Sequence, residues 1–528
     1  MDPKKRQLPE LCGELERLRA EGKRIVLCHG VFDLLHVGHI RHFQQARQLG
    51  DLLVVTVTPD RYVNKGANRP AFPQELRAEV IASLDCVDFV AVNLWSSAVE
   101  TIERLRPHVF AKGSEFKHRE DTLGHVAKEE QAVRQVGGEI AFTDDITFSS
   151  SGVINQFLSP FSQEVIDYLV DFSKRYTADD VLRPLCEARN KSVLLIGETI
   201  LDEYRYCDAI GKSGKEPVLV TQIHSVDEFV GGILACANHV ASFCDHVSVL
   251  SFIGEHGEKE SFIRQHLKPN IEATLLRKPE SPTLTKMRFV ERYSSQKLFE
   301  VYEMNDQPLD AQTDARLCSM LKSTLPKYDI VIVADYGHGM LSPNAISVIC
   351  AHANFLAVNT QSNAGNHGFN MISKYPRADY VCLAQREFAL ETRNQQMTPE
   401  EMVLHVSRNL QASRLMLTQG RSGSLSYSKE EGFRQVPAFN TDVVDRVGAG
   451  DAVLSTTALA VASGAAAEAV GFLGNVVGAD SVKIMGNKQS IERLPLFRHV
   501  ECLMKAHNPS RESDEHESQD RRKLRIAA

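Results

Sequence analysis

The sequence has little of what membrane, secreted and zinc-binding proteins need. No run among its 528 residues reaches the roughly 18 apolar residues of a membrane span, and the first residues, MDPKKRQLPELCGELERLRAEGKR, are charged where a secretion signal would be apolar. Its 11 cysteines are odd in number and form no C-x-x-C pair, which argues against a disulfide framework and against a zinc site. We therefore expect a cytoplasmic protein with reduced thiols.

Basic residues are also fewer than acidic ones. The chain has 60 Lys and Arg residues against 68 Asp and Glu residues, a formal net charge of -8. This balance argues against a protein whose main role is to neutralise nucleic-acid phosphates, whereas anionic small molecules remain possible ligands. The 43% hydrophobic and 24% charged residues are typical of a soluble globular protein, and the length favours two or more cores. We expect no nucleic-acid partner and no membrane partner.

Short β-rich runs alternate with helical segments from Arg24 to about Ile154. RIVLCHGVFD and DLLVVTVTPD are typical of strands, and helices are predicted over 39–50 and 77–84. The same alternation continues through DFVAV and HVFAKGSE. Such a pattern predicts a parallel sheet covered by helices. We assign residues 1–159 to this first α/β domain.

The rest of the chain contains a second and longer alternation. Residues 160–190 have the charge pattern of two amphipathic helices and are expected to form a helical linker. Predicted strands at SVLLIGE, HVSVLSFIG, DIVIVADYG, FLAVNT, YVCLAQ and RLMLTQG, with small-residue helices near the end, indicate a larger α/β domain over residues 191–506. Residues 507–528 mix charges of both signs with almost no apolar content and predict a disordered tail.

The first chemical pattern is the segment Gly30-Val31-Phe32-Asp33-Leu34-Leu35-His36-Val37-Gly38-His39, where a strand is expected to turn into a helix. A helix N-terminus presents unpaired N–H groups and the positive end of the helix dipole, so it favours phosphate. His36 and His39 are three residues apart and can reach the same phosphate, while Gly38 permits a close approach. An isolated H-x-x-H would more often be two surface histidines.

This segment resembles the H-x-G-H signature of the cytidylyltransferase-like nucleotidyltransferases, including the upstream G-x-F-D. Further stretches resemble motifs of that family and follow in order: Thr58-x-Asp60, Lys65-Gly66, Arg69-Pro70, Arg77, Lys112-Gly113-Ser114 and Ser149-Ser150-Ser151. The resemblance implies a Rossmann-like domain in which a sugar phosphate oxygen attacks the α-phosphorus of a nucleoside triphosphate and pyrophosphate leaves.

The same resemblance implies roles for individual residues. His36 and His39 would be catalytic and would act on the phosphates, with Mg²⁺ on the triphosphate. Nucleotide or phosphate binding is implied for Gly30, Phe32, Asp33, Lys65, Arg77, Lys112, Ser150 and Ser151. Lys65 and Arg77 could instead be ordinary solvated charges. The motif leaves the choice between ATP and CTP open.

The second chemical pattern, Gly448-Ala449-Gly450-Asp451, precedes a helix of small residues. A glycine-rich turn that leads into a helix N-terminus makes an anion hole from backbone N–H groups. The Asp451 carboxylate could then take the proton of a hydroxyl that attacks a γ-phosphate. Alone, the pattern could equally be a tight turn capped by an aspartate.

The turn resembles the D-T-x-G-A-G-D box of the ribokinase-like (PfkB) carbohydrate kinases. Other motifs of that family are matched in order by Gly197-Glu198 with Asp202, Gly231-Gly232, Asp335-Tyr336-Gly337, and Leu417-Thr418-Gln419-Gly420 with Gly423. The resemblance implies Asp451 as the catalytic residue. It implies that ATP is bound by Thr418, Gly420, Gly448, Ala449 and Gly450, and the sugar by Asp202, Gly231, Gly232, Lys286 and Arg288.

Pro282-Thr283-Leu284-Thr285-Lys286-Met287-Arg288 with Gln296, and Lys215-Glu216-Pro217-Val218, look most like the heptose-phosphate kinases. Over about residues 24–490 the chain resembles the bifunctional ADP-heptose synthases, with the domain order reversed. This resemblance implies a sugar kinase joined to a sugar-phosphate nucleotidyltransferase that makes a nucleotide-activated, heptose-like sugar for surface polysaccharide. It also makes a homodimer through the strands near the double glycine plausible.

Several positions depart from the kinase pattern. Arg446 stands where the box carries a small residue, His338 replaces the lysine of D-Y-x-K-G, Val358-Asn359-Thr360-Gln361 replaces D-P-K, and Ala384 replaces an asparagine. An alternative is therefore an active nucleotidyltransferase with a catalytically degenerate kinase-like domain that only binds a sugar or sugar phosphate. Because Asp451 and its anion hole remain, an active kinase is favoured over that alternative and over a non-catalytic scaffold.

Two polar segments allow two interpretations each. Residues 359–370, rich in Asn and Gly, could form a substrate loop or a polar connection between elements, and the substrate loop is favoured. Asp144-Asp145 could be a magnesium pair, but a helix-capping or solvated role is favoured. No metal ligand is therefore assigned.

Overall fold

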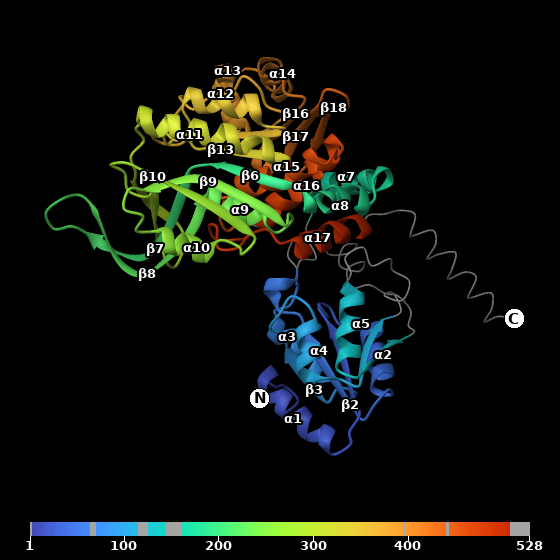
Figure 1. The fold of residues 1–528 in the computed structure, drawn as a ribbon. Coiled ribbons are helices and arrows are strands. Elements are labelled where there is room, and N and C mark those ends of the chain that lie inside the picture. Colours follow the sequence, from blue (N-terminus) through green and yellow to red (C-terminus); the bar gives the residue numbers. More distant parts are fainter. Residues whose placement is uncertain are drawn as a thin grey trace. The chain divides into compact units, whose positions relative to one another are not determined.

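The computed structural model describes residues 3–63, 70–113, 125–143, 161–394, 396–439 and 443–506 (Figure 1). Met1–Pro160 and Phe497–His507 form one compact unit, unit 1, and Phe161–Leu496 belongs to a second, unit 2. None of the helices in these described ranges combines the length and the apolar character that a membrane crossing needs. The predicted site residues Lys65, Ser150 and Ser151, the Asp144-Asp145 pair and the 507–528 tail lie outside the described residues.

Unit 1 contains the parallel sheet that the sequence predicted. Its strands are β1 (Ile25–Gly30), β2 (Leu52–Val57), β3 (Phe89–Val92), β4 (Val109–Gly113) and β5 (Glu139–Thr143), in the order β3-β2-β1-β4-β5 with every pairing parallel. Its helices are α1 (Leu8–Ala20), α2 (Val37–Arg47), α3 (Gln74–Ala82), α4 (Val99–Leu105) and α5 (His125–Gln135). The strand order reverses between β1 and β4, and ligands bind at the carboxyl ends of the strands at such a point.

Unit 2 is built on a nine-stranded sheet with the order β10-β9-β6-β13-β14-β15-β16-β17-β18. The strands are β6 (Ser192–Gly197), β9 (His246–Gly254), β10 (Ile271–Lys278), β13 (Ile330–Asp335), β14 (Leu356–Thr360), β15 (Tyr380–Ala384), β16 (Arg414–Thr418), β17 (Ser424–Ser428) and β18 (Gly432–Val436). Pairing is parallel from β10 to β16 and antiparallel over the last three strands. The sequence predicted the central strands but not β10, β17 or β18.

Helices cover both faces of this sheet (Figure 1). They are α7 (Gln163–Arg175), α8 (Ala178–Glu187), α9 (Ile233–Val240), α10 (Glu260–His266), α11 (Ala311–Thr324), α12 (Pro343–His352), α13 (Gln385–Thr392), α14 (Pro399–Leu410), α15 (Ala449–Ala462) and α16 (Ala467–Ser481). One core joins α11, α12 and α14 to the strands through Leu321, Ile349, Val403 and Val333. Helices α9 and α15 pack on the central strands as well. The last helix, α17 (Arg493–Ala506), begins in unit 2 and contributes its residues from Phe497 to unit 1.

The expectation of a separate helical linker over 160–190 needs a correction. The two predicted helices are present as α7 and α8, but they pack within unit 2. The Phe172 ring stacks on Phe472 of α16 with 4.4 Å between centroids, and Arg175 pairs with the buried carboxylate of Glu468. Because burial of these aromatic rings removes large apolar surfaces from water, the two helices are part of the unit 2 core.

A second, four-stranded sheet in unit 2 was not predicted. It has the order β12-β11-β7-β8, with β7 (Thr199–Lys212), β8 (Leu219–Gly232), β11 (Thr285–Glu291) and β12 (Lys297–Glu303). The distal part of the β7–β8 hairpin projects from the rest of unit 2 (Figure 1). Side chains alternate between two faces, so that Asp202 and Tyr204 are buried on one face while Phe299 and Val301 are half exposed on the other. We call this element the small sheet.

Candidate functional site

In unit 1, the carboxyl end of β1 leads into the predicted phosphate-binding turn. His36 is the N-cap of α2, and its Nδ1 accepts a hydrogen bond of 3.1 Å from the backbone N–H of Gly38. The rings of His36 and His39 stack with 4.0 Å between their centroids. The structure thus brings both imidazoles together at the positive end of the α2 dipole, where an anion is favoured.

The residues before the histidines shape this turn. Phe32 has a φ of 47°, and its ring packs against His39 and Phe43. A side chain at Gly30 would meet the Phe32 ring at 2.8 Å, which explains the glycine. Asp33 is buried and accepts hydrogen bonds from the backbone N–H groups of Ala71 and Phe72. Phe32 and Asp33 therefore hold the turn in place and orient His39.

Arg77 is buried at the carboxyl edge of the unit 1 sheet. Its side chain is 0% exposed, and its guanidinium donates to the carbonyl oxygens of Val31, Phe72 and Thr58 and to the Asp60 carboxylate. This burial does not fit a solvated charge, and the role of Arg77 as a phosphate ligand stays a prediction. Its donors are used to join three loops at the carboxyl edge of the sheet.

Two further charged or titratable groups lie near the ends of β1 and β4. Lys112 forms an ion pair with the carboxylate of Glu129, and both side chains are largely buried. His29, which the sequence analysis did not single out, contacts the hydroxyl oxygens of Thr56 at 2.9 Å and Thr58 at 3.3 Å. Burial, then Arg498 and Lys112, lower the pKa of His29 to about 3. His29 is therefore neutral and serves as a hydrogen-bonding group.

In unit 2, Asp451 lies in the first turn of α15, three residues after the left-handed Gly448 at its N-cap. Its Oδ1 accepts two hydrogen bonds of 2.9 Å, from the Tyr336 hydroxyl and from the Gln361 side-chain amide. Burial raises the pKa of Asp451 to about 7, and Asp202 contributes in the same direction. A carboxylate of this pKa at a helix N-terminus can act as a general base near neutral pH.

The turn before Asp451 is fixed by Asp445. The Asp445 carboxylate accepts hydrogen bonds from the Tyr204 hydroxyl, the Lys297 ammonium and the backbone N–H of Gly486. It also accepts bonds from the next two backbone N–H groups, those of residues 446 and 447. These bonds, with the ion pair to Lys297, hold the pKa of Asp445 below its usual value despite burial. The glycine-rich turn is therefore preorganised.

Asn487 joins this turn to the predicted sugar side and was missed in the sequence. Its side-chain amide donates to Asp202 Oδ2 at 2.9 Å, and its own oxygen lies against Gly448, where an added Cβ would meet it at 2.2 Å. A Cβ at Gly231 would meet the same Asp202 oxygen at 2.2 Å. Gly232 follows with a φ of 57° at the N-cap of α9. The structure thus brings Asp202, the double glycine and the Gly448 turn together.

The predicted sugar residues of β11 lie on the buried face of the small sheet. Arg288 pairs with Asp202 and with Glu300, while the ammonium of Lys286 lies 5.2 Å from the centre of the Tyr302 ring. The register of the sheet aligns Lys286 with Asp202 on β7, which places the lysine beside the Asp202–Arg288 pair.

The remaining predicted nucleotide residues lie at the ends of β16 and α15. Thr418 is the last residue of β16, and the turn that follows uses Gly420 and Gly423 with positive φ. Ala449 and Gly450 form the first turn of α15. Backbone N–H groups at a helix start have no partner within the helix, as an anion site requires, although the N–H of Ala449 donates a long bond of 3.4 Å to the Arg446 carbonyl oxygen.

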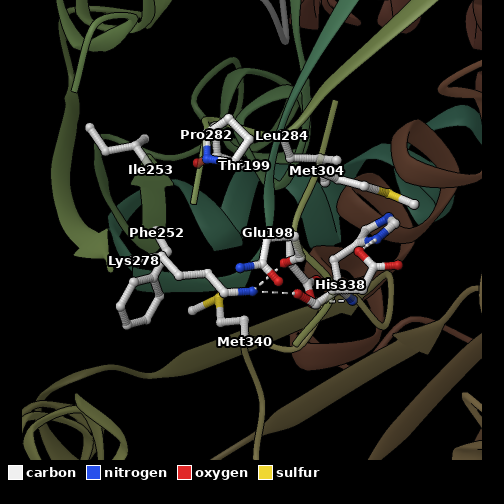
Figure 2. A pocket seen from close by; sticks show the side chains of 12 residues that line it. Glu198, Thr199, Phe252, Ile253, Lys278, Pro282, Leu284, Met304, His338 and Met340 are labelled. Carbon is white, nitrogen blue, oxygen red and sulfur yellow. Dashed lines mark hydrogen bonds and ion pairs between the residues drawn. The ribbon is translucent and has the colours of Figure 1, made fainter. Parts of the chain in front are cut away.

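A pocket adjoins the turn that carries Tyr336 (Figure 2). Its lining residues are Glu198, Thr199, Phe252, Ile253, Lys278, Pro282, Leu284, Met304, Asn305, Asp306, His338 and Met340. The Glu198 carboxylate accepts from the backbone N–H groups of Tyr336 and His338, both at 3.0 Å. Burial and the nearby Asp335 raise the pKa of Glu198. This carboxylate fixes the turn that positions the Tyr336 hydroxyl.

The substitutions that departed from the kinase pattern are accommodated by the structure. His338 contacts Asp306 through Nδ1 at 2.8 Å, and burial followed by Lys286 lowers its pKa. The ammonium of Lys278 donates to the His338 carbonyl oxygen. The side chain of Arg446 is exposed, so its bulk does not disturb the turn. His338 and Gln361, which stand at the lysine positions of D-Y-x-K-G and D-P-K, therefore keep hydrogen-bonding roles, with Asp306 and Asp451 respectively.

The Asn-rich segment 359–370 supports the site through its amide side chains, and its role as a substrate loop stays a prediction. Asn363 and Asn366 each donate at 2.8 Å to the carbonyl oxygen of Tyr336, and Asn370 donates at 2.8 Å to that of Asp335. Gln361 of the same segment contacts Asp451. These amides bind the carbonyl oxygens of the Tyr336 turn, whose backbone N–H groups Glu198 binds.

Comparison with known proteins agrees with the division of the chain into two units. Residues 190–493 match the family model of the pfkB family carbohydrate kinases, and residues 27–155 match the cytidylyltransferase-like family model. Among solved structures, unit 2 is similar to a ribokinase from Thermotoga maritima, with a TM-score of 0.47 and 18% identity over 60% of this chain and 99% of that chain. A phosphofructokinase-2 from Escherichia coli in complex with fructose-6-phosphate gives a TM-score of 0.48 and 14% identity over 60% and 99%.

Curated relatives share a shorter stretch. A bifunctional protein HldE from Geobacter sulfurreducens is 39% identical over 168 residues, 31% of this chain and 33% of the relative. The HldE of Geotalea uraniireducens is 43% identical over 117 residues, 22% and 24% of the two chains. The chain therefore matches about a third or less of the length of these relatives, and the reversed domain order stays a prediction.

The two matched ranges fall within the two units, residues 27–155 in unit 1 and nearly all of residues 190–493 in unit 2. The chain carries a cytidylyltransferase-like domain in its N-terminal part. Since the second family model covers more than half of the residues, the chain belongs to the pfkB family of carbohydrate kinases.

Proposed function

We propose that this chain is a bifunctional enzyme that phosphorylates a heptose-like sugar phosphate and then couples a sugar phosphate to a nucleotide. The relatives named bifunctional protein HldE and the two family matches support a kinase combined with a nucleotidyltransferase. The product would be a nucleotide-activated sugar for surface polysaccharide. In this proposal ATP is the phosphoryl donor, and ATP or CTP is the nucleotidyl donor.

The arrangement around Asp451 carries the kinase half of the proposal. In the reaction, the acceptor hydroxyl oxygen attacks the γ-phosphorus of ATP, its proton passes to Asp451, and ADP leaves. Tyr336 and Gln361 both donate to Oδ1, so Oδ2 is the oxygen available for that proton. The backbone N–H groups of Ala449 and Gly450 would donate hydrogen bonds to phosphate oxygens of ATP. An intact base at an intact anion hole favours turnover over a domain that only binds sugar.

The His36–His39 pair supports the transferase half. A sugar phosphate oxygen would attack the α-phosphorus of the nucleoside triphosphate, and pyrophosphate would leave. The two stacked imidazoles at the N-terminus of α2 would stabilise charge that develops on the phosphates. Lys65, Ser150 and Ser151 remain proposed ligands on the strength of the sequence resemblance.

Mg²⁺ would accompany the triphosphate in the kinase. The buried oxygens Ser362 Oγ and Glu387 Oε2 have no hydrogen-bond partner within the described residues, and the Ser362 backbone N–H donates to the other oxygen of Glu387. Oxygen donors of this kind fit the preference of Mg²⁺. These two residues would hold the ion, which when bound supplies neutralisation of the phosphate charge.

We further propose that the outer face of the small sheet pairs with a second copy of the chain. Val226, Phe299 and Val301 on this face are 45–49% exposed, and the rings of Phe289 and Phe299 stack at 4.5 Å. An exposed apolar face of this kind marks an interaction surface. Light scattering coupled to gel filtration should give a dimer mass for the wild type and a monomer mass for Val301→Glu.

The two activities are tested by two assays on the purified wild type and on two single variants of it. ADP formation from ATP is measured with a panel of sugars and sugar phosphates, and pyrophosphate release with four nucleoside triphosphates and sugar 1-phosphates. Asp451→Asn should abolish ADP formation and leave pyrophosphate release, whereas His39→Ala should do the reverse. ADP formation that survives Asp451→Asn, or its absence with every acceptor, would contradict the kinase half and favour a domain that only binds sugar.

A further inference from the structure

The turn that carries Tyr336 is held by carboxylates that bind its backbone. The N–H groups of Tyr336 and His338 donate to the two carboxylate oxygens of Glu198, both at 3.0 Å. The N–H group of Gly337, which lies between them and has a φ of 72°, donates to the Asp335 carboxylate at 3.1 Å. Successive backbone N–H groups in a turn of this kind favour an anion. The carboxylate of Glu198 therefore acts as the anion that this turn binds.

Glu198 lies where the chain passes from the nine-stranded sheet to the small sheet. It stands between Gly197, the last residue of β6, and Thr199, the first residue of β7, and it is buried. Its side chain lines the pocket that also contains Lys278 and His338 (Figure 2). A buried carboxylate is costly unless hydrogen bonds compensate its lost hydration. Because each oxygen of Glu198 bonds to the backbone of the Tyr336 turn, the purpose of this carboxylate lies in that turn.

The Tyr336 hydroxyl connects this turn to Asp451. It donates to Asp451 Oδ1 at 2.9 Å, and the Gln361 amide donates to the same oxygen. Burial raises the pKa of Asp451, and the hydrogen bond from Tyr336 is the largest influence that lowers it. Of the charged groups nearby, Asp202 raises this pKa and Lys286 lowers it. Loss or displacement of the hydroxyl would therefore keep Asp451 protonated up to a higher pH.

We propose that Glu198 is a positioning residue for phosphoryl transfer, which fixes the Tyr336 turn so that its hydroxyl stays bonded to the carboxylate of Asp451. This inference rests on the proposed kinase function, in which Asp451 accepts the proton of the acceptor hydroxyl. A direct electrostatic effect of Glu198 would have the opposite sign. Removal of a nearby negative charge would lower the pKa of Asp451, whereas displacement of the Tyr336 hydroxyl would raise it.

The test follows the titration of Asp451 in the full chain, without turnover, by ¹³C NMR of protein labelled at the aspartate carboxyl carbons. The signal that is lost in Asp451→Asn identifies the residue. Tyr336→Phe should move its titration midpoint about 1–2 pH units higher, the range of one hydrogen bond to a charged group. Glu198→Gln should move it at least about 0.5 pH units higher, because an amide nitrogen cannot accept from a backbone N–H. In the double variant, Glu198→Gln should add less than about 0.3 pH units to the effect of Tyr336→Phe.

Asp379→Asn is the matched control, because Asp379 makes the same kind of contact elsewhere in the nine-stranded sheet. Its carboxylate accepts the backbone N–H of Leu356 at 2.8 Å, at the start of β14, whereas Gln361 follows the other end of that strand. Asp379→Asn should leave the Asp451 midpoint within about 0.2 pH units of the wild type, since distant sites act independently. A cooperative thermal transition in circular dichroism shows that each variant is folded.

Two results would overturn the proposal. One is an Asp451 midpoint in Glu198→Gln that is unchanged or lower, and the other is a double variant in which the two effects add in full. The acid limb of kcat for ADP formation is then measured on the same variants, and it should follow the NMR midpoints. If the midpoints move as expected but the acid limb does not, or no acceptor gives ADP, the link from Glu198 to Asp451 stands and the proposed kinase function fails.

Discussion

Replacement of Asp451 by asparagine should make unit 2 more stable while it removes the kinase activity. The side chain is buried, and its pKa is raised from 3.8 to about 7 by burial. Asparagine keeps an oxygen at the position that accepts from Tyr336 and Gln361, so both hydrogen bonds are retained. What disappears is the cost of a buried negative charge.

The size and sign of this effect follow from linkage. One pKa unit is worth about 1.4 kcal/mol, so the difference between 3.8 and about 7 corresponds to about 4 kcal/mol. The folded state binds the proton more tightly than the unfolded state, so the free energy of unfolding falls as the pH rises from about 4 to about 7. Asp451→Asn should therefore stabilise by up to about 4 kcal/mol at pH 8, and by much less at pH 5.

The single tryptophan allows the two units to be followed separately. Trp95 lies in unit 1, so tryptophan fluorescence follows that unit, while circular dichroism follows both. The unfolding of unit 2 is therefore the transition seen by circular dichroism but not by fluorescence. In urea titrations, Asp451→Asn should shift this transition to a higher urea concentration. The fluorescence transition should stay at the wild-type midpoint.

Asp445→Asn is a control of opposite sign in the same turn. The pKa of Asp445 is lowered, with burial offset by bonds from Lys297 and Tyr204. Its contribution to stability is present above the unfolded pKa and is lost as the pH falls, so its asparagine variant should be less stable at pH 8. The reasoning is refuted if Asp451→Asn destabilises unit 2 at pH 8, or if its effect does not shrink at pH 5.

Three other variants test single contacts. Gln361→Lys places a cation beside Asp451 and should lower the pKa of the base, so the acid limb of the pH profile of kcat for ADP formation should move to lower pH; an unchanged profile would contradict this. Asn487→Ala removes the bond between the sugar side and the glycine turn and should raise KM for the acceptor about tenfold, with the midpoint of thermal unfolding nearly unchanged. Arg77→Met leaves buried acceptors unpaired and should lower the free energy of unfolding of unit 1 by about 3–5 kcal/mol, measured by Trp95 fluorescence. A loss of pyrophosphate release without a loss of stability would instead support Arg77 as a phosphate ligand.

The main sheets could be predicted because their strands have a simple signature. Parallel strands buried on both faces read as continuous runs of Val, Ile and Leu, as in β6 and β13. The small sheet lacks this signal, because one face of β7 and β11 contains Asp202, Lys286 and Arg288. Its buried face is polar, so hydrophobic periodicity did not indicate strands there.

The local part of each site could be predicted as well. His36, His39 and Asp451 are all at or near helix N-termini, which a few consecutive residues determine. Contacts between distant segments could not be predicted, because they depend on the tertiary structure. Gln361 bonds to Asp451, 90 positions away, and Asn487 bonds to Asp202, 285 positions away. The buried position of Arg77 is of the same kind.

The departures from the kinase pattern gather around Asp451 and act together. Lysines at positions 338 and 361 would favour the ionised carboxylate, whereas the neutral Gln361 and His338 leave burial to raise the pKa of Asp451 to about 7. Lys286 is the cation that lowers it. A carboxylate with a pKa of about 7 is ionised in a substantial fraction of molecules at neutral pH, and it binds a proton far more strongly than an exposed aspartate does. Burial without a neighbouring lysine at positions 338 and 361 therefore suits Asp451 to accept the proton of an acceptor hydroxyl.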